Sequence, residues 1–140
     1  MSVPVELSVV LPCLNEAESV GICIEKVRAV LERHGIAGEI IVVDNGSTDG
    51  SADIVRTRYP FVRLVEEPER GYGAALRRGI GAATGTYVLM ADADDTYDFP
   101  KIPEFLSLLR QGYDLVMGSR FRGTILPGAM TWSHRYIGNP

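Results

Sequence analysis

The chain has 140 residues, of which 46% are hydrophobic, and this size and composition fit a single globular domain over residues 1–140. The 14 basic and 18 acidic residues give a net charge of -4, which argues against nucleic acid as a partner. Two cysteines, Cys13 and Cys23, are too few for a disulfide scaffold, and we expect both to be reduced core thiols of a cytosolic protein. No signal peptide is visible, and no apolar run approaches the ~20 residues that span a bilayer.

The first predicted strand covers residues 7–11, and a helical pattern follows it. Asn15 and Glu18 have the form of a capping box, and Gly35 is a natural helix terminator. Apolar residues recur at the spacing of one helix face, and they are Val20, Cys23, Ile24, Val27, Val30 and Leu31.

The rest of the chain repeats this alternation of short apolar runs and helical patterns. The further predicted strands are residues 40–43, 63–65, 87–90 and 115–117, and the further helices are residues 51–58, 73–83 and 101–110. Such alternation builds a mostly parallel sheet covered by helices, so the predicted fold class is α/β and Rossmann-like. The last residues, 138–140, form no closing helix, which favours a truncated domain.

Four polar segments follow the predicted strands, at the edge where loops and helix N-termini of a parallel sheet converge on ligands. One alternative is that Asn15 and Glu16 act merely as helix caps and that Asp44, Asn45 and Gly46 form a simple turn. An acidic residue that closes a buried strand can instead accept hydrogen bonds from a nucleobase or ribose. The four segments are Pro12-Cys13-Leu14-Asn15-Glu16, Asp44-Asn45-Gly46-Ser47-Thr48-Asp49, Arg70-Gly71-Tyr72-Gly73 and Asp92-Ala93-Asp94-Asp95.

The third segment has the start of a dinucleotide-binding fingerprint but does not complete it. Gly71 and Gly73 open a helix, but Leu76 stands where a third glycine is required. Glycines allow a ligand to approach the backbone closely, and Arg70 beside a helix N-terminus can face a phosphate. A plain glycine turn with a solvated arginine explains these residues equally well.

The fourth segment carries the strongest sign of a binding site. Asp92, Asp94, Asp95 and Asp98 follow an apolar strand, and such crowding costs repulsion that a surface turn does not need. Magnesium or manganese would relieve this repulsion, because these cations bind carboxylate oxygens together with the phosphates of a ligand. The sequence therefore predicts Asp92 and Asp94 as metal ligands, with a solvated acidic loop as the alternative.

Arginines gather after the last predicted strand. Gly118-Ser119-Arg120 and then Arg122 follow that strand, and arginine is suited to bidentate contact with phosphate. Apolar residues lie between Arg120 and Arg135 without helix or strand period, which favours a surface that meets lipid tails and phosphate headgroups. Packing against the rest of a larger domain is the alternative. These apolar residues are Phe121, Ile125, Leu126, Met130 and Trp132.

Taken together, the segments resemble family 2 glycosyltransferases, in particular dolichol-phosphate mannosyltransferases and bacterial polyprenyl-phosphate sugar transferases. Four motifs occur in the expected order: Pro-x-x-Asn-Glu at 12–16, Asp-x-Gly-Ser-x-Asp at 44–49, the basic glycine loop at 70–73 and Asp-x-Asp at 92–94. There are two departures. Leu14 stands where an aromatic residue is frequent in the dolichol enzymes, and Thr96 stands where some members have a metal-binding glutamine.

The resemblance implies a fold of the glycosyltransferase A (GT-A) type that binds a UDP- or GDP-linked sugar with Mg²⁺ or Mn²⁺. It implies that Asp92 and Asp94 hold the metal on the diphosphate, that Arg120 meets a phosphate, and that Arg135 contacts the acceptor phosphate. Asp94, Arg120 and Arg135 are therefore the expected catalytic residues. Pro12, Leu14, Glu16 and Asp44 would surround the nucleoside. All the expected donor-binding residues are Pro12, Leu14, Asn15, Glu16, Asp44, Gly46, Ser47, Arg70, Gly71, Gly73, Asp92 and Ala93.

The chemistry of the acceptor favours the lipid-phosphate branch of this family. A hydroxyl acceptor requires a general base, and the family's candidate for that role lies downstream of residue 140. A phosphate acceptor needs no base, because its second pKa of about 6 leaves it largely a dianion at neutral pH. We therefore expect transfer, with inversion, to a polyprenyl phosphate at the cytoplasmic face of a membrane.

Three alternatives compete with this hypothesis. The first is a family 2 enzyme that acts on a saccharide hydroxyl, and the second is a donor-binding module without turnover, since closing loops and the acceptor groove can lie outside residues 1–140. The third is a sugar-phosphate nucleotidyltransferase, which would carry a glycine-rich loop with Arg or Lys directly after the first strand. Pro12 to Glu16 occupy that position, which argues against the third alternative.

Overall fold

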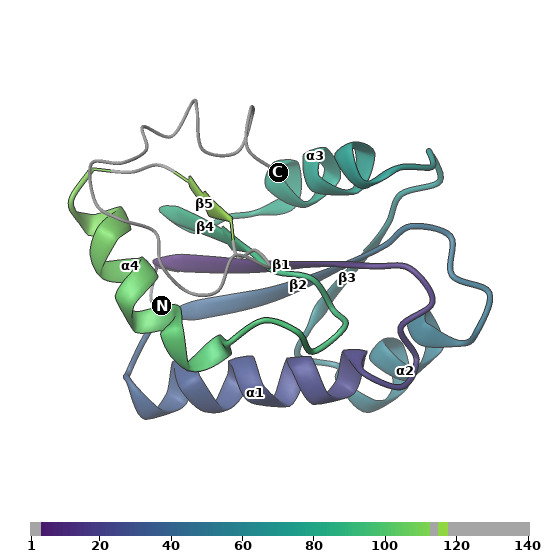
Figure 1. The fold of residues 1–140 in the computed structure, drawn as a ribbon, viewed down its shortest axis with the longest axis horizontal. Coiled ribbons are helices and arrows are strands. Elements are labelled where there is room, and N and C mark those ends of the chain that lie inside the picture. Colours follow the sequence, from purple (N-terminus) through teal and green to yellow (C-terminus); the bar gives the residue numbers. More distant parts are fainter. Residues whose placement is uncertain (1–3, 113–114, 118–140) are drawn as a thin grey trace.

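The structure, a computed structural model, describes residues 4–112 and 115–117 of the chain. Its centre is a five-stranded sheet in the order β3-β2-β1-β4-β5, in which every neighbouring pair is parallel (Figure 1). All five predicted strands are present, and the first three extend slightly beyond the predicted runs. The strands are β1 (Leu7–Cys13), β2 (Gly38–Asp44), β3 (Arg63–Glu66), β4 (Tyr87–Met90) and β5 (Leu115–Met117).

The strand order reverses between β1 and β4. The chain builds β1, β2 and β3 outward in one direction and then returns to place β4 on the other side of β1. Loops that follow the two strands at such a reversal leave in opposite directions and open a crevice beyond the carboxyl ends of the strands. These loops lie on the right-hand side of Figure 1.

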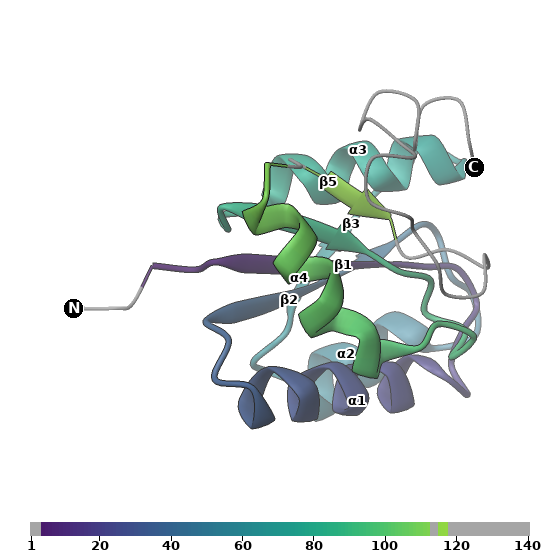
Figure 2. The same cartoon turned by 60° about the vertical axis from the view of Figure 1, so that its left-hand side comes forward.

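Helices cover both faces of the sheet (Figures 1 and 2). One face carries α1 (Val20–Arg33), α2 (Ser51–Arg58) and α4 (Ile102–Arg110), together with the short 3-10 helix η1 (Phe99–Lys101). The other face carries α3 (Tyr72–Ala82). Successive side chains of a strand point to opposite faces, so Val9 packs in the α1 cluster and Val10 in the α3 cluster. The sequence prediction of a helix-covered parallel sheet is therefore confirmed.

The predicted helix boundaries need two small corrections and one larger one. Helix α3 begins at Tyr72 and ends at Ala82, one residue before the predicted range at each end, and α4 begins at Ile102 because residues 99–101 form the 3-10 turn. The predicted capping box is wrong. Helix α1 begins at Val20, with Ser19 as N-cap, and the side-chain oxygen of Asn15 instead accepts the N–H of Thr48 at 2.8 Å. A partner 33 residues away in the sequence has thus replaced the local one.

The end of α1 and the two cysteines match the predictions. Gly35 adopts φ +61° after the last helical turn, and its N–H donates to the backbone oxygen of Glu32, as a glycine terminator should. Cys13 and Cys23 are free and buried, and burial raises their pKa values to about 11 and about 12, so both remain protonated thiols. Of the helices in the described ranges, none combines the length and the apolar character needed to cross a membrane.

Candidate active site

A pocket of about 330 Å³ opens beyond the carboxyl ends of β1 and β4, at the reversal of the strand order. Ligands of open parallel sheets bind at this place. Seven of the residues predicted from the sequence to bind the donor or the metal line the pocket. The complete lining is Pro12, Cys13, Leu14, Glu16, Asn45, Gly71, Tyr72, Ala75, Asp92, Ala93 and Asp94.

Hydrogen bonds join the loop after β1 to the loop after β2. The N–H of Asn15 donates to Ser47 Oγ at 2.9 Å, and the N–H of Thr48 donates to Asn15 Oδ1 at 2.8 Å. The next two N–H groups of the first loop donate to Ser51 Oγ and to Asp49 Oδ2. Asn15 and Ser47, both predicted donor-binding residues, therefore fix the shape of the two loops in this structure and do not line the pocket.

Asp44, the last residue of β2, is buried and only partly satisfied. Asp44 is 4% exposed, and its Oδ2 accepts a hydrogen bond from the N–H of Ser47 at 3.2 Å. Its Oδ1 has no hydrogen-bond partner within residues 4–112 and 115–117. A buried carboxylate oxygen without a donor is unfavourable, so this atom is suited to accept a hydrogen bond from a ligand.

Two carboxylates of the acidic segment face the pocket and a third is engaged elsewhere. Asp92 Oδ1 accepts the hydroxyl of Tyr72 at 3.1 Å, and Asp94 Oδ1 accepts the N–H and the hydroxyl of Thr96. Both aspartates line the pocket. Asp95 has φ +63° and pairs with Lys26 of α1 at 2.8 Å, outside the pocket lining.

The chemistry of these groups fits a divalent cation that is completed by a ligand. In the part of the chain that the structure describes, no group of three or more His, Cys, Asp or Glu side chains is placed to hold a metal without further ligands. Asp92 and Asp94 alone would leave most coordination sites of Mg²⁺ or Mn²⁺ for water and diphosphate oxygens, as these cations require.

The electrostatics of the pocket are also those of a cation site. Burial raises the pKa of Glu16 above its ordinary value, and the negative charges of Asp94, Asp92 and Asp49 raise it further. Burial is the largest cause of this rise, and the three neighbouring carboxylates add a smaller contribution from their negative charge. A bound cation would offset this negative charge.

Sequence reasoning missed four lining residues, Cys13, Asn45, Tyr72 and Ala75, of which Asn45 and Tyr72 make side-chain hydrogen bonds across the site. The side chain of Asn45 hydrogen-bonds to the loop that precedes α3, and Tyr72, the first residue of α3, donates its hydroxyl to Asp92. Asn45 and Tyr72 stand inside the motifs at 44–49 and 70–73, at positions where the motif accepts any residue. A signal for Asn45 was its place directly after a buried acidic strand end.

Several other residues predicted at the site either do not line the pocket or lie outside the described residues. Arg70 is exposed and does not line the pocket, and Gly73 lies in the first turn of α3, also outside the lining. Gly46 adopts φ +89° in the turn after β2 and stays outside it as well. Arg120 and Arg135, with the rest of residues 118–140, lie outside the described residues.

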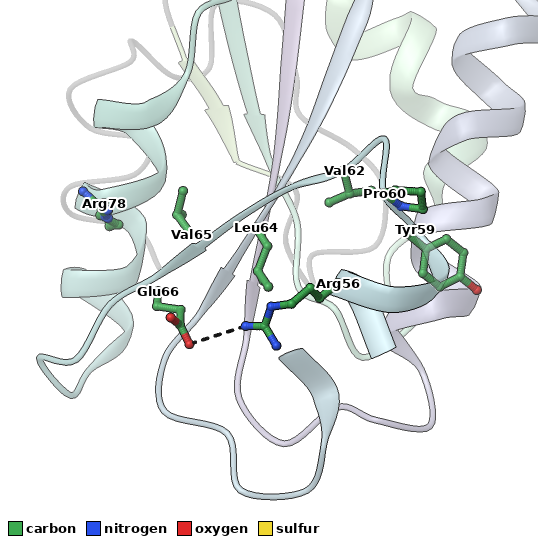
Figure 3. Close-up of a pocket in the computed structure, with 8 residues that line it drawn as sticks. All are labelled: Arg56, Tyr59, Pro60, Val62, Leu64, Val65, Glu66 and Arg78. Carbon is green, nitrogen blue, oxygen red and sulfur yellow. Dashed lines mark ion pairs between the residues drawn. The ribbon is translucent and has the colours of Figure 1, made fainter. Parts of the chain in front are cut away.

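A second, larger pocket of about 630 Å³ lies beside the edge strand β3 (Figure 3). Arg56 and Glu66 form an ion pair across it at 4.0 Å, and Arg78 approaches from α3 on the other side of β3. None of the predicted site residues lines this pocket, and it holds no pair of carboxylates. The smaller pocket at the strand-order reversal is therefore the candidate active site.

Comparisons with known proteins indicate the family of the chain. The family model described as Glycosyl transferase family 2 matches residues 8–140. The chain is 44% identical over 135 residues to a low-salt glycan biosynthesis hexosyltransferase of Haloferax volcanii, covering 96% of the chain and 32% of that protein. It is 32% identical over 115 residues to a dolichyl-phosphate hexose transferase of the same organism, covering 82% of the chain and 48% of that protein.

A solved structure also shares the fold. Glucosyl-3-phosphoglycerate synthase from Mycobacterium tuberculosis, crystallised with Mn²⁺, uridine diphosphate and glucosyl-3-phosphoglycerate, superimposes with a TM-score of 0.61 at 28% identity. The match covers 74% of this chain and 39% of that one, so the chain spans less than half the length of these relatives. The parallel sheet, its strand-end pocket and the family match over nearly the whole chain lead to one assignment: this chain belongs to glycosyltransferase family 2 and has the GT-A type of fold.

Proposed function

We propose that the pocket between β1 and β4 binds the nucleoside diphosphate of a UDP- or GDP-linked sugar together with Mg²⁺ or Mn²⁺. The observation that carries this proposal is the pair of carboxylates, Asp92 and Asp94, on the wall of a pocket at the strand-order reversal. Asp44 Oδ1, which has no hydrogen-bond partner among the described residues, supports a nucleoside contact at the end of β2. The related synthase that was crystallised with Mn²⁺ and uridine diphosphate supports the same ligands.

We further propose that the full-length protein transfers the sugar to a polyprenyl phosphate, with inversion, at the cytoplasmic face of a membrane. The similarity to a dolichyl-phosphate hexose transferase supports this acceptor. A phosphate dianion is nucleophilic without a general base, so the protein has only to align it with the anomeric carbon. A single displacement then inverts the configuration of the sugar.

The roles of the chain's own residues follow from this reaction. Asp44 would accept a hydrogen bond from the nucleoside, and Asp92 and Asp94 would hold the metal. When bound, the cation supplies positive charge that stabilises the departing nucleoside diphosphate. Arg120 would add charge at a donor phosphate, and Arg135 would orient the acceptor phosphate.

The test compares sugar transfer by the full-length protein to polyprenyl phosphate and to the matching free alcohol. We expect product from the phosphate only, and we expect Arg135→Ala to lower turnover while nucleotide binding stays intact. Equal transfer to the alcohol would overturn the lipid-phosphate acceptor and favour a hydroxyl. Nucleotide binding without transfer to either acceptor would identify a donor-binding module.

A further inference from the structure

Asn45 connects the end of β2 to the loop that precedes α3. The residue is 8% exposed, and its side chain makes three hydrogen bonds to that loop. Nδ2 donates to the backbone oxygens of Glu67 at 2.9 Å and Glu69 at 2.8 Å, and Oδ1 accepts the N–H of Gly71 at 3.2 Å. The contacts use both donor hydrogens and the acceptor of an amide, and a carboxylate could not make the first two.

The loop held by Asn45 determines where α3 begins. Gly71 is the N-cap of α3 with φ +123° and ψ +147°, and its backbone oxygen accepts the N–H of Ala75, four residues along, at 3.1 Å. The next residue, Tyr72, donates its hydroxyl to Asp92 Oδ1 at 3.1 Å. Asn45, Gly71, Tyr72 and Asp92 all line the pocket. A continuous series of contacts thus crosses the site from the end of β2 to the end of β4.

We propose that Asn45 is a positioning residue for donor binding. By holding residues 67–71, it sets the start of α3 so that Tyr72 meets Asp92 and fixes the orientation of that carboxylate toward the pocket. The inference rests on the proposed function, because it assumes that the pocket receives a nucleoside diphosphate with a cation. The loop uses both donor hydrogens and the acceptor of the Asn45 amide, which no carboxylate can reproduce, and this match carries the inference.

The variant Asn45→Asp tests this role with little change in shape. It removes both donors and places carboxylate oxygen against two carbonyl oxygens, so the loop should detach. Gln111→Glu is the matched control, because it makes the same amide-to-carboxylate change on the exposed residue that ends α4. Asn45→Ser removes the three hydrogen bonds without adding charge and replaces N45D in all measurements if N45D does not fold.

The first measurement is amide hydrogen exchange in the absence of ligand. In N45D we expect the Gly71 and Ala75 amides to exchange about tenfold faster or more, while amides in β1 and β2 change much less. Gln111→Glu should leave the exchange rates of all these amides as in wild type. A uniform acceleration over the whole chain would mean that Asn45 only contributes to global stability, and it would overturn the inference.

The second measurement is calorimetric titration with uridine diphosphate and guanosine diphosphate in the presence of Mn²⁺. We expect N45D to bind about tenfold more weakly, the size expected for residues that orient metal ligands. In a Tyr72→Phe background, N45D should lower the nucleotide affinity by a clearly smaller factor, since the hydroxyl through which Asn45 acts is already gone.

The outcomes separate the inference from the proposed function. If the wild-type chain binds neither nucleotide with Mn²⁺, the proposed function fails and the inference fails with it. If wild type binds and N45D binds equally well, or if the N45D and Y72F effects simply add, the inference alone is overturned.

Discussion

Polar residues at the strand ends form two groups that differ in the direction of their contacts. Asn15, Asn45 and Ser47 hydrogen-bond to the backbone of neighbouring loops, whereas Asp92 and Asp94 face the pocket. The first group fixes the shape of the site and the second supplies its charge. Substitutions in the first group should therefore change loop order, and substitutions in the second should change binding at nearly constant stability.

Asp94→Asn tests the charged group. The amide can still accept the hydrogen bonds from Thr96, so the fold should persist, but a neutral oxygen is a much poorer ligand for a hard cation. We expect the affinity for uridine or guanosine diphosphate with Mn²⁺ to fall about tenfold or more. Calorimetry with and without a chelator measures this, and equal binding in both conditions would remove the metal role of the acidic pair.

Asp95→Asn is the control for the loss of one negative charge in the same loop. Asp95 pairs with Lys26 and does not line the pocket, so its substitution should leave nucleotide affinity within about twofold of wild type. A loss of affinity as large as that of D94N would indicate a general charge effect and not metal coordination.

Asp44→Ala tests the nucleoside contact. We expect a loss of about 1.5–3 kcal/mol in binding free energy for the nucleotide, the usual cost of a lost hydrogen bond to a charged group. The same titration measures it. If the affinity stays constant and the melting temperature falls, Asp44 serves only to hold the Ser47 turn.

At the scale of elements, the close approach of α3 to the sheet depends on one glycine. A Cβ on Gly79 would lie 2.3 Å from Val10 Cγ1 and 3.1 Å from Val43 Cγ2. Both valines belong to the core cluster on the α3 side. The position of α3, which brings Gly71, Tyr72 and Ala75 to the pocket, is thus set by backbone packed against strand side chains.

Gly79→Ala should therefore destabilise the protein by about 1–3 kcal/mol, as overpacking of a core does. Gly81→Ala is the matched control in the same helix, since Gly81 is exposed and nothing lies within 4 Å of its added Cβ. That variant should stabilise the protein by about 0.5–1 kcal/mol through helix propensity. Urea unfolding measures both, and a G79A variant as stable as G81A would contradict the packing explanation.

At the scale of the whole molecule, Glu39 of β2 links the amino-terminal ends of the neighbouring strands. Its Oε2 accepts the hydroxyl of Ser8 in β1 at 2.6 Å and the N–H and hydroxyl of Thr84 before β4, and its Oε1 accepts Arg63 of β3. Burial by itself raises the pKa of Glu39, but the hydrogen bonds from Ser8, Thr84 and Arg63 outweigh it and hold the pKa below its ordinary value of 4.5. This side of the sheet, opposite the pocket, contributes to stability.

The sign of the resulting pH dependence follows from linkage. A carboxyl with a lowered folded pKa stabilises the protein above its ordinary pKa of 4.5, and this contribution is lost as the pH falls through the folded value. Glu39→Gln should cost about 1–3 kcal/mol of unfolding free energy at pH 7. The difference from wild type should shrink below about pH 4.

Urea unfolding between pH 7 and pH 3 measures this prediction. Glu18→Gln is the control, because Glu18 is exposed and makes no hydrogen bond or ion pair with the residues that the structure describes. A wild-type to E39Q difference that stays constant over this pH range would show that Glu39 does not act through its charge.

The sequence by itself determined the architecture. The five strands, four helices and parallel arrangement follow from apolar periodicity, which is a local property: Val20, Cys23, Ile24, Val27 and Leu31 are buried as their spacing predicts. The order of the motifs also determined the family, because the segments at 12–16, 44–49, 70–73 and 92–94 each keep their residue types at fixed spacing. The prediction of the fold required nothing more.

Only the tertiary structure decided how the residues within those segments divide their roles. Asn15 has the sequence pattern of a helix cap, yet its partner is Thr48, and Asn45 has the pattern of a turn, yet its partners lie between residues 67 and 71. Asp94 and Asp95 are adjacent and chemically identical, but Asp94 lines the pocket whereas Asp95 pairs with Lys26 of α1. Hydrogen bonds and ion pairs between segments depend on how loops meet in space, and residue spacing along the chain carries no record of that meeting.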